Sequence, residues 1–198
     1  MDKGIFNERE KAMEANYFRQ EDAKLLEQLR KRGSLDDIAA ALRDKLQLDN
    51  PDLLQKVRDL GIQPDTASAF FVAPLVQVAW ADGAAGKPER DAVLRLAHKR
   101  GVEPGSPAHA QLEEWLKVRP SDALFDTAVE VIKYGFSVLP LAEQNERIKA
   151  IVDACQEVAS ASGKGLAPLL GLGSTVSRTE ASMLDSIKNH LRAPRHGT

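Results

Sequence analysis

Residues 69–81 read AFFVAPLVQVAWA and are apolar at every position except Gln77. A helix with this composition has no polar face, so it must be buried on all sides. Pro74 must either kink the helix or lie in its first turn, because proline lacks the N–H that a helix interior requires. We therefore predict that Ala69–Ala81 is the central helix of the main domain.

The residues downstream of this stretch read as a loop over 82–86 and then as further helices. Sustained alternation of apolar and polar residues, which would indicate strands, does not occur. The sequence therefore predicts an all-α fold. The expected helices are Lys87–Arg100, Pro107–Val118, Ser121–Val138, Leu141–Ala161, and a last one from Ser177 or Arg178 to Leu191.

The residues upstream predict a short helical hairpin over 33–66. Leu35–Leu48 has an amphipathic pattern, and Asn50 followed by Pro51 is a helix start signal for Pro51–Leu60. We expect this hairpin to connect residues 1–32 to a compact helical bundle over 67–192, with the boundary at Gln63–Asp65. Residues 193–198 are expected to form a flexible tail.

The first 32 residues predict a protruding, highly charged helix. Residues 6–32 contain no proline or glycine and are rich in helix-forming residues. Their apolar residues form two small patches, so such a helix has little surface with which to pack against its own domain. Two interpretations remain open: a lightly docked terminal helix, or a helix that presents aromatic anchors to the groove of a partner.

Composition limits the classes of function. The 198 residues are 43% hydrophobic and 28% charged with a formal net charge of −2, which is typical of a globular protein and does not favour binding to nucleic acid or anionic membranes. No apolar run approaches the roughly 20 residues that span a bilayer, and the basic-then-apolar pattern of a signal peptide is missing. Cys155 is the single cysteine, and we expect it to be a small apolar residue in a helix. We predict a cytoplasmic protein.

Sequence patterns for catalysis are missing. The four histidines, His98, His109, His190 and His196, show no pair at metal-ligand spacing on one helix face. There is no Gly-x-Ser-x-Gly motif, and Cys155 has no activating base next to it in sequence. The prediction is a protein that is not an enzyme.

The N-terminal segment carries an unusual set of residues: Phe6, Arg9, Glu10, Ala12, Glu14, the triplet Tyr17-Phe18-Arg19, and Gln28-Leu29. In this spacing, without a gap, it resembles the inhibitory segment of the mitochondrial ATP synthase inhibitor protein. The resemblance covers about a seventh of the chain. It implies binding to the catalytic head of ATP synthase at an interface between α and β subunits, peripheral to the membrane, where the helix would stop ATP hydrolysis.

The resemblance also implies a role for each matching residue. Glu14 would pair with a basic group on the β subunit, and Tyr17 and Phe18 would fill apolar pockets. The charges of Arg9, Glu10 and Arg19 would fix the register of the helix in its groove. Phe6 would lie deepest, towards the central stalk. Dimerisation does not carry over, because Gly33 breaks the helix where the inhibitor continues into a coiled coil. A histidine pH switch in the helix is excluded, since no histidine precedes His98.

Two short segments in the larger, C-terminal part of the chain form an imperfect internal repeat. Residues 78–83 (VAWADG), followed by Glu89, echo residues 158–163 (VASASG), followed by Glu180. With its seven or so helices, the chain over about 68–192 resembles the tellurite-resistance TerB-like family. In that family the acidic corners are associated with divalent metal, which here implies Asp82 and Glu89 as weak candidate ligands.

The metal prediction has an alternative. The second corner has Ser162 where an Asp is expected, and hard cations need several oxygen ligands. Asp82 and Glu89 can instead cap helix ends. We therefore expect no obligatory cofactor. The loop over 164–177 contains several leucines that either fold over the core or form a partner patch.

Three functional hypotheses follow. The first is a non-enzymatic regulator that inhibits ATP hydrolysis through its N-terminal helix. The second is a TerB-like, stress-associated metal-binding or protein-interaction module without ATPase inhibition. The third is an adaptor that holds two protein partners.

Overall fold

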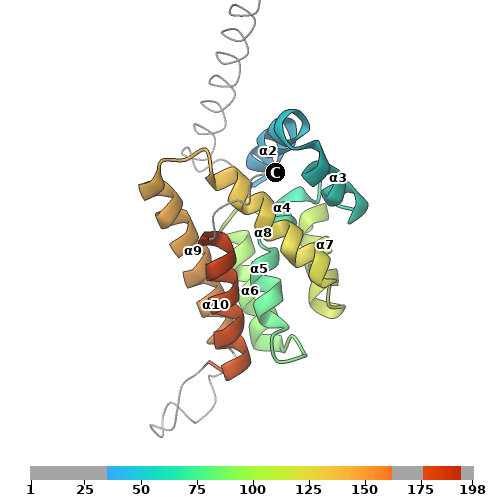
Figure 1. Cartoon of the computed structure of the whole chain (residues 1–198). Coiled ribbons are helices and arrows are strands. Elements are labelled where there is room, and N and C mark those ends of the chain that lie inside the picture. The colour runs from blue at the N-terminus through green and yellow to red at the C-terminus, as the bar shows by residue number, and fades with distance from the viewer. Residues whose placement is uncertain (1–34, 162–175, 193–198) are drawn as a thin grey trace, which may run out of the picture.

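The computed structural model describes residues 35–161 and 176–192, and these residues form helices, turns and loops without strands (Figure 1). The all-α prediction is confirmed for this part of the chain. Its helices are α2 (Leu35–Asp49), α3 (Pro51–Asp59), α4 (Ala67–Phe70), α5 (Ala73–Ala79), α6 (Lys87–His98), α7 (Pro107–Lys117), α8 (Asp122–Phe136), α9 (Leu141–Ala159) and α10 (Arg178–Arg192).

The predicted central helix over 69–81 is two short helices, so that prediction needs a correction. Pro74 lies in the first turn of α5, and its ring would clash with the carbonyl of Phe70 if the helix were continuous. Tight turn bonds bridge the break: the Val72 N–H donates to the Ala69 carbonyl at 3.1 Å, and the Leu75 N–H donates to the Val72 carbonyl at 3.0 Å. None of the residues from 69 to 81 is exposed and nine of the thirteen are buried, so the expected burial is confirmed for most of the stretch; Phe71, Gln77, Trp80 and Ala81 are partly buried.

Helices α5, α6, α9 and α10 lie side by side in the lower half of Figure 1, and α8 crosses above α5 and α10. Helix α7 packs on the other side of α5 and also contacts α4 and α6. Trp80, at the end of α5, donates its indole N–H to the Trp115 carbonyl of α7 at 2.9 Å. The short helix α5 is therefore surrounded by its neighbours, which explains its apolar sequence.

Helices α2 and α3 share the core of the bundle. Leu42 and Leu54 belong to one cluster of buried residues that extends to Leu191 of α10. The phenol hydroxyl of Tyr134 in α8 donates to Asp49 Oδ2 of α2 at 2.7 Å. The predicted boundary at 63–65 thus lies in the turn between α3 and α4, within a continuous core.

Helix starts follow from local sequence signals. The Asn50 side chain accepts a hydrogen bond from the Leu53 N–H at 3.1 Å, with Pro51 at the first helical position, as the sequence predicted. Ser106 and Ser121 also accept a hydrogen bond from the backbone N–H three residues on, and so cap α7 and α8.

No helix in the described ranges combines the length and the apolar character that crossing a bilayer requires.

Candidate functional site

The candidate residues of the N-terminal segment lie outside the described residues. These are Phe6, Arg9, Glu10, Glu14, Tyr17, Phe18 and Arg19. Ser162 and the leucines of the 164–177 loop also lie outside them. The remaining candidates, Asp82 and Glu89, belong to the first of the two repeated corners.

The first corner meets the start of α10 in space. Asp82, in the loop between α5 and α6, is about 95 residues from the start of α10, yet its Oδ1 accepts a hydrogen bond from the Ser177 hydroxyl at 2.8 Å. The Thr179 hydroxyl donates to the same oxygen. Asp82 therefore places a negative charge at the N-terminal end of α10, where the helix dipole stabilises it.

Glu180 closes a capping box at the start of α10. Its Oε2 accepts a hydrogen bond from the Ser177 N–H at 2.7 Å, and its own N–H donates to the Ser177 hydroxyl oxygen at 3.1 Å. These reciprocal bonds satisfy two N–H groups that a helix end leaves without partners. The side chain is buried, with 3% of the residue exposed.

Glu89 occupies the repeat-related position in the first turn of α6, but its contacts differ. The residue is 8% exposed, and its Oε2 is buried without a hydrogen-bond partner among the described residues. This oxygen would lie 2.5 Å from a Cβ added to Gly86, so the carboxylate rests against the glycine that precedes α6. The Glu89 carboxylate at the start of α6 thus has a buried oxygen without a hydrogen bond, whereas the corresponding oxygen of Glu180 at the start of α10 accepts one.

Asp82, Glu89 and Glu180 do not form a common cluster in the described residues. In the described part of the chain, no group of three or more His, Cys, Asp or Glu side chains is placed to hold a metal ion. Asp82 is engaged with two hydroxyl groups, and Glu180 is engaged in its cap. Hard cations take about six to eight oxygen ligands, which this arrangement does not supply. Asp82 lies at the N-terminal end of α10 and accepts hydrogen bonds from two side-chain hydroxyls there, and the metal site at Asp82 and Glu89 stays a prediction.

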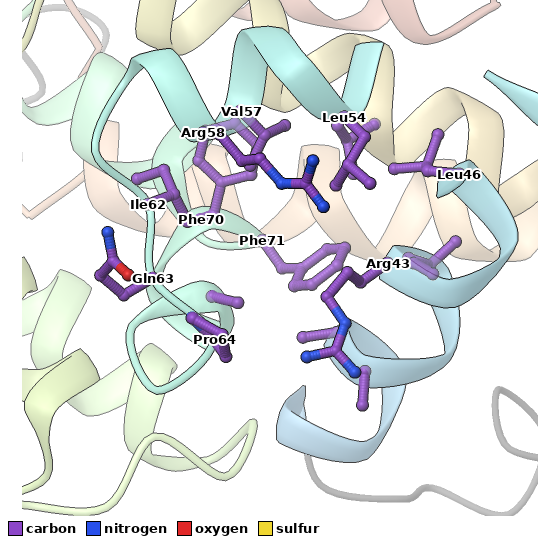
Figure 2. A pocket seen from close by; sticks show the side chains of 15 residues that line it. Arg43, Leu46, Leu54, Val57, Arg58, Ile62, Gln63, Pro64, Phe70 and Phe71 are labelled. Atoms are coloured by element: carbon purple, nitrogen blue, oxygen red, sulfur yellow. The ribbon is translucent and has the colours of Figure 1, made fainter. Parts of the chain in front are cut away.

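A pocket of about 640 Å³ opens between α2, α3 and α4 (Figure 2). Twelve of the fifteen residues that line it are apolar, and the polar ones are Arg43, Arg58 and Gln63. The apolar lining consists of Ala39, Ala40, Leu42, Leu46, Leu54, Val57, Ile62, Pro64, Ala67, Phe70, Phe71 and Val131. The sequence did not predict this pocket, because its lining residues come from the predicted connector, the start of the bundle and Val131 of α8, and only the packing of the helices brings them together.

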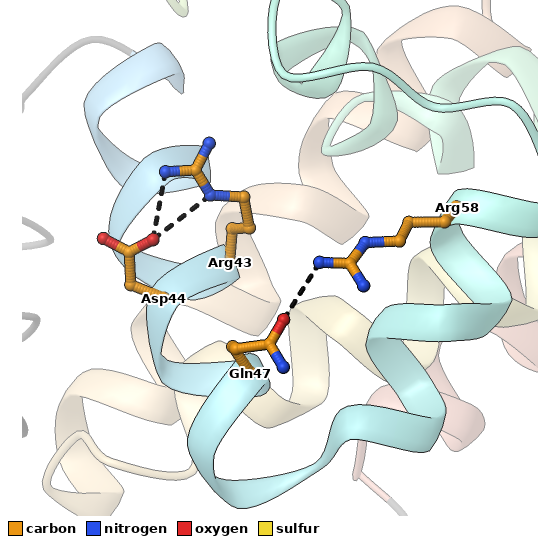
Figure 3. A network of polar contacts seen from close by, with 4 residues as sticks. All are labelled: Arg43, Asp44, Gln47 and Arg58. Atoms are coloured by element: carbon orange, nitrogen blue, oxygen red, sulfur yellow. Dashed lines mark hydrogen bonds and ion pairs between the residues drawn. The ribbon is translucent and has the colours of Figure 1, made fainter.

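Both arginines of the pocket have weak or neutral partners. Arg43 Nη2 lies 3.0 Å from Oδ1 of Asp44, its neighbour in sequence, and both side chains are about half exposed or more. Arg58 Nη2 donates to the neutral side-chain carbonyl of Gln47 at 2.9 Å (Figure 3). Figure 2 shows the two side chains reaching the pocket from α2 and α3, with the Phe71 ring between them in that view.

Comparisons with known proteins add no relative. Protein-family models, curated proteins and solved structures give no significant match to this chain. Function therefore has to be argued from the residues themselves.

Cys155 is completely buried in α9, as predicted. Burial raises the pKa of its thiol to about 12, although the nearby Arg100 charge opposes this shift. Burial also lowers the pKa of Arg100, whose guanidinium donates to the Leu96 carbonyl at 3.1 Å and to the Ala150 carbonyl at 3.4 Å. A thiol in this environment stays protonated at neutral pH, so it is a packing residue and not a nucleophile.

Proposed function

We propose that this protein is a non-enzymatic regulator that inhibits ATP hydrolysis by the catalytic head of ATP synthase. Residues 1–32 are the effector, and the helical domain carries them. The observation that carries the proposal is the spacing from Phe6 through Glu14 to Tyr17-Phe18-Arg19. This set combines aromatic and charged residues, which are the usual anchors of a helix that binds in a groove.

In the proposed complex, the effector binds between an α and a β subunit of the head. Glu14 pairs with a basic group of the β subunit, and Tyr17 and Phe18 fill apolar pockets. Arg9, Glu10 and Arg19 set the register, while Phe6 extends towards the central stalk. Loss of one buried anchor is expected to cost about 2 kcal/mol of binding free energy or more.

Features of the helical domain support a carrier role. Its large apolar side chains are mostly buried, and in the described residues only Val118 and Leu141 are large hydrophobic residues with high exposure. Aromatic anchors of the kind found in residues 6–18 are therefore not displayed on this part of the surface. The buried, protonated thiol of Cys155 also argues against a thiol-dependent enzyme.

The test is ATP hydrolysis by the purified catalytic head from the same source, titrated with the full-length chain. The native chain is expected to inhibit, and a variant with Glu14→Ala and Tyr17→Ala is expected to lose at least ten-fold in potency. A matched control, Glu113→Ala with Val118→Ala, also removes one acidic and one apolar side chain, both exposed on the helical domain. It should inhibit like the native chain. No inhibition by the native chain at micromolar excess would contradict the proposal.

A second candidate is a TerB-like protein-interaction module that does not inhibit the ATPase. The repeated sequence corners at 78–83 and 158–163 favour this interaction module, because the helix that follows each of them has a buried glutamate in its first turn, Glu89 in α6 and Glu180 in α10. This arrangement agrees with the internal repeat on which the resemblance rests. The same hydrolysis titration separates the candidates, since an interaction module leaves ATP hydrolysis unchanged. Calcium that raises the melting temperature of the native chain but not of Asp82→Ala would favour its metal-binding form.

A further inference from the structure

The pocket between α2, α3 and α4 has the character of a ligand site. Its volume of about 640 Å³ lies within the range of roughly 300–1,000 Å³ that is usual for small-molecule pockets. Such pockets are mostly apolar, with a few polar groups that orient the ligand. Here the apolar lining comes from α2, α3 and α4 with the adjoining Phe71, from the turn that joins α3 to α4, and from Val131 of α8.

The charged residues that line the pocket are both basic. Arg43 and Arg58 line it, and none of the fifteen described lining residues is acidic. Over the whole chain, by contrast, acidic residues outnumber basic ones, with a formal net charge of −2. Two positive charges beside an apolar cavity are complementary to a molecule with an anionic head and an aliphatic body.

The arginines are available to such a head group. Arg43 pairs with a solvent-exposed neighbour, an interaction that contributes little to stability. Arg58 donates to an uncharged amide, and no carboxylate of the described residues pairs with its guanidinium. A guanidinium binds a carboxylate through two parallel hydrogen bonds, which are stronger than bonds to a neutral amide.

Phe71 lines the pocket together with the two arginines. It is partly buried and packs against the core, whereas its neighbour Phe70 is 2% exposed. Figure 2 shows its ring between the two arginine side chains. Leu46, Leu54 and Val131 are among the apolar residues of the lining.

We propose that this pocket binds a single-chain amphiphilic carboxylate, of the class of long-chain fatty acids. The carboxylate pairs with Arg43 and Arg58, and the aliphatic chain lies in the apolar interior. This site is separate from the effector residues of the proposed function, so the two proposals stand or fall on different measurements.

The test uses the full-length chain and a fluorescent fatty acid with a free carboxylate, 11-(dansylamino)undecanoic acid, displaced by palmitate. Saturable binding with a dissociation constant in the micromolar range is expected. Hexadecanol, which keeps the chain but lacks the charge, should displace the probe at least ten-fold less well. Equal displacement by the alcohol, or no saturable binding up to 100 µM probe, would overturn the proposal.

Variants locate the site. Arg43→Gln with Arg58→Gln should weaken probe binding at least ten-fold, and Ala40→Trp should block it, because Ala40 is an exposed lining residue where a large ring fills the mouth. The control Lys87→Gln with Lys117→Gln also removes two positive charges, both exposed and on α6 and α7, and should change binding less than two-fold. Circular dichroism confirms that each variant is folded. Unchanged binding in the arginine or tryptophan variant would place the probe elsewhere and refute the assignment.

The pocket could instead be filled by a segment of the same chain or by a second copy, and the binding assay distinguishes both cases from the proposal. Either result would contradict the proposal. If Tyr17→Ser with Phe18→Ser creates probe binding that the native chain lacks, the pocket belongs to the N-terminal segment of the same chain. If probe binding is lost as protein concentration rises and a dimer forms, a second copy covers the pocket.

Discussion

At the scale of single residues, Glu89 and Glu180 show how one position of a repeat can have two different environments. Both lie in the first turn of a helix and both are buried. Glu180 accepts a hydrogen bond from the backbone of Ser177, whereas Oε2 of Glu89 has no partner. The same substitution should therefore have different consequences at the two sites.

We predict that Glu180→Gln lowers the free energy of unfolding by about 1–2 kcal/mol, because a neutral amide is a weaker acceptor for the Ser177 N–H than a carboxylate. Glu89→Gln should change it by less than about 0.5 kcal/mol, since the loss of charge near a helix N-terminus is offset by easier burial of a neutral group. Urea unfolding at pH 7 measures both. A larger loss at Glu89 than at Glu180 would show that its oxygen has a partner in solution.

Cys155 leads to a pH-dependent prediction. Burial raises the pKa of the folded thiol from its ordinary value of 9.0 to about 12. The stability that the neutral thiol contributes is fully present below pH 9 and is lost as the pH rises towards 12, because the unfolded chain releases its proton first.

Compared with Cys155→Ala, the native chain should be more stable at pH 7 by about 1–2 kcal/mol, since the alanine leaves a small cavity. Above pH 9, this difference should shrink by up to about 1.4 kcal/mol per pH unit. The comparison with the variant removes the effects of lysines and tyrosines, which titrate in the same range. A difference that is constant from pH 7 to 10.5 would contradict the prediction, as would rapid reaction of the native thiol with a disulfide reagent.

At the scale of elements, the contact of Asp82 with Ser177 and Thr179 ties the α5–α6 loop to the start of α10. We predict that Asp82→Ala lowers the free energy of unfolding by about 1 kcal/mol at most, because two hydroxyl donors lose an acceptor at an exposed site. The loss should be the same with EDTA and with calcium.

A double-mutant cycle with Thr179→Val tests the contact itself. The two substitutions together should cost less than the sum of the single ones, with a coupling of at least about 0.5 kcal/mol. Additive losses would mean that the contact does not contribute. Calcium-dependent stability that disappears in Asp82→Ala would instead support a metal site at this corner.

Gly135 of α8 allows α2 to pack closely. A Cβ added at Gly135 would lie 3.0 Å from Cδ2 and 3.1 Å from Cδ1 of the buried Leu42. We predict that Gly135→Val destabilises the protein by about 1–3 kcal/mol through overpacking. Combined with Leu42→Val, it should cost less than the two single changes added together.

The control for this prediction is Ala150→Val, a similar change at an exposed position of α9. It should cost only the difference in helix propensity, about 0.6 kcal/mol. An equal cost at both positions would show that α2 does not pack against Gly135. Thermal unfolding followed by circular dichroism measures the native chain, the two single variants, their combination and the control.

At the scale of the whole molecule, one continuous core includes α2 and α3 together with α10. We therefore predict a single cooperative unfolding transition. Fluorescence of Trp80 and Trp115, which report on α5 and α7, should change at the same urea concentration as the helical circular dichroism signal. An earlier loss of part of the helical signal, with slow hydrogen exchange retained only after residue 67, would show that residues 33–66 form a separate unit.

Local sequence patterns were enough for the fold class and for most helix boundaries. Asn50 with Pro51 marked the start of α3, and the helix expected over 141–161 is α9, two residues shorter. The uniform apolar composition of residues 69–81 predicted burial correctly. It could not show whether Pro74 kinks a helix or begins a new one, because that depends on the backbone of the preceding turn.

The sequence by itself determined that residues 35–161 and 176–192 form buried, capped helices without strands, because periodicity and capping act over a few neighbouring residues. It also holds, in residues 6–19, the spacing on which the proposed function rests. Only the tertiary structure decided that the Asp82 corner meets the start of α10, and that Arg43 and Arg58 face one apolar pocket with Phe71. Both features join residues far apart along the chain, and their distances depend on how the helices pack against each other, which no local pattern specifies.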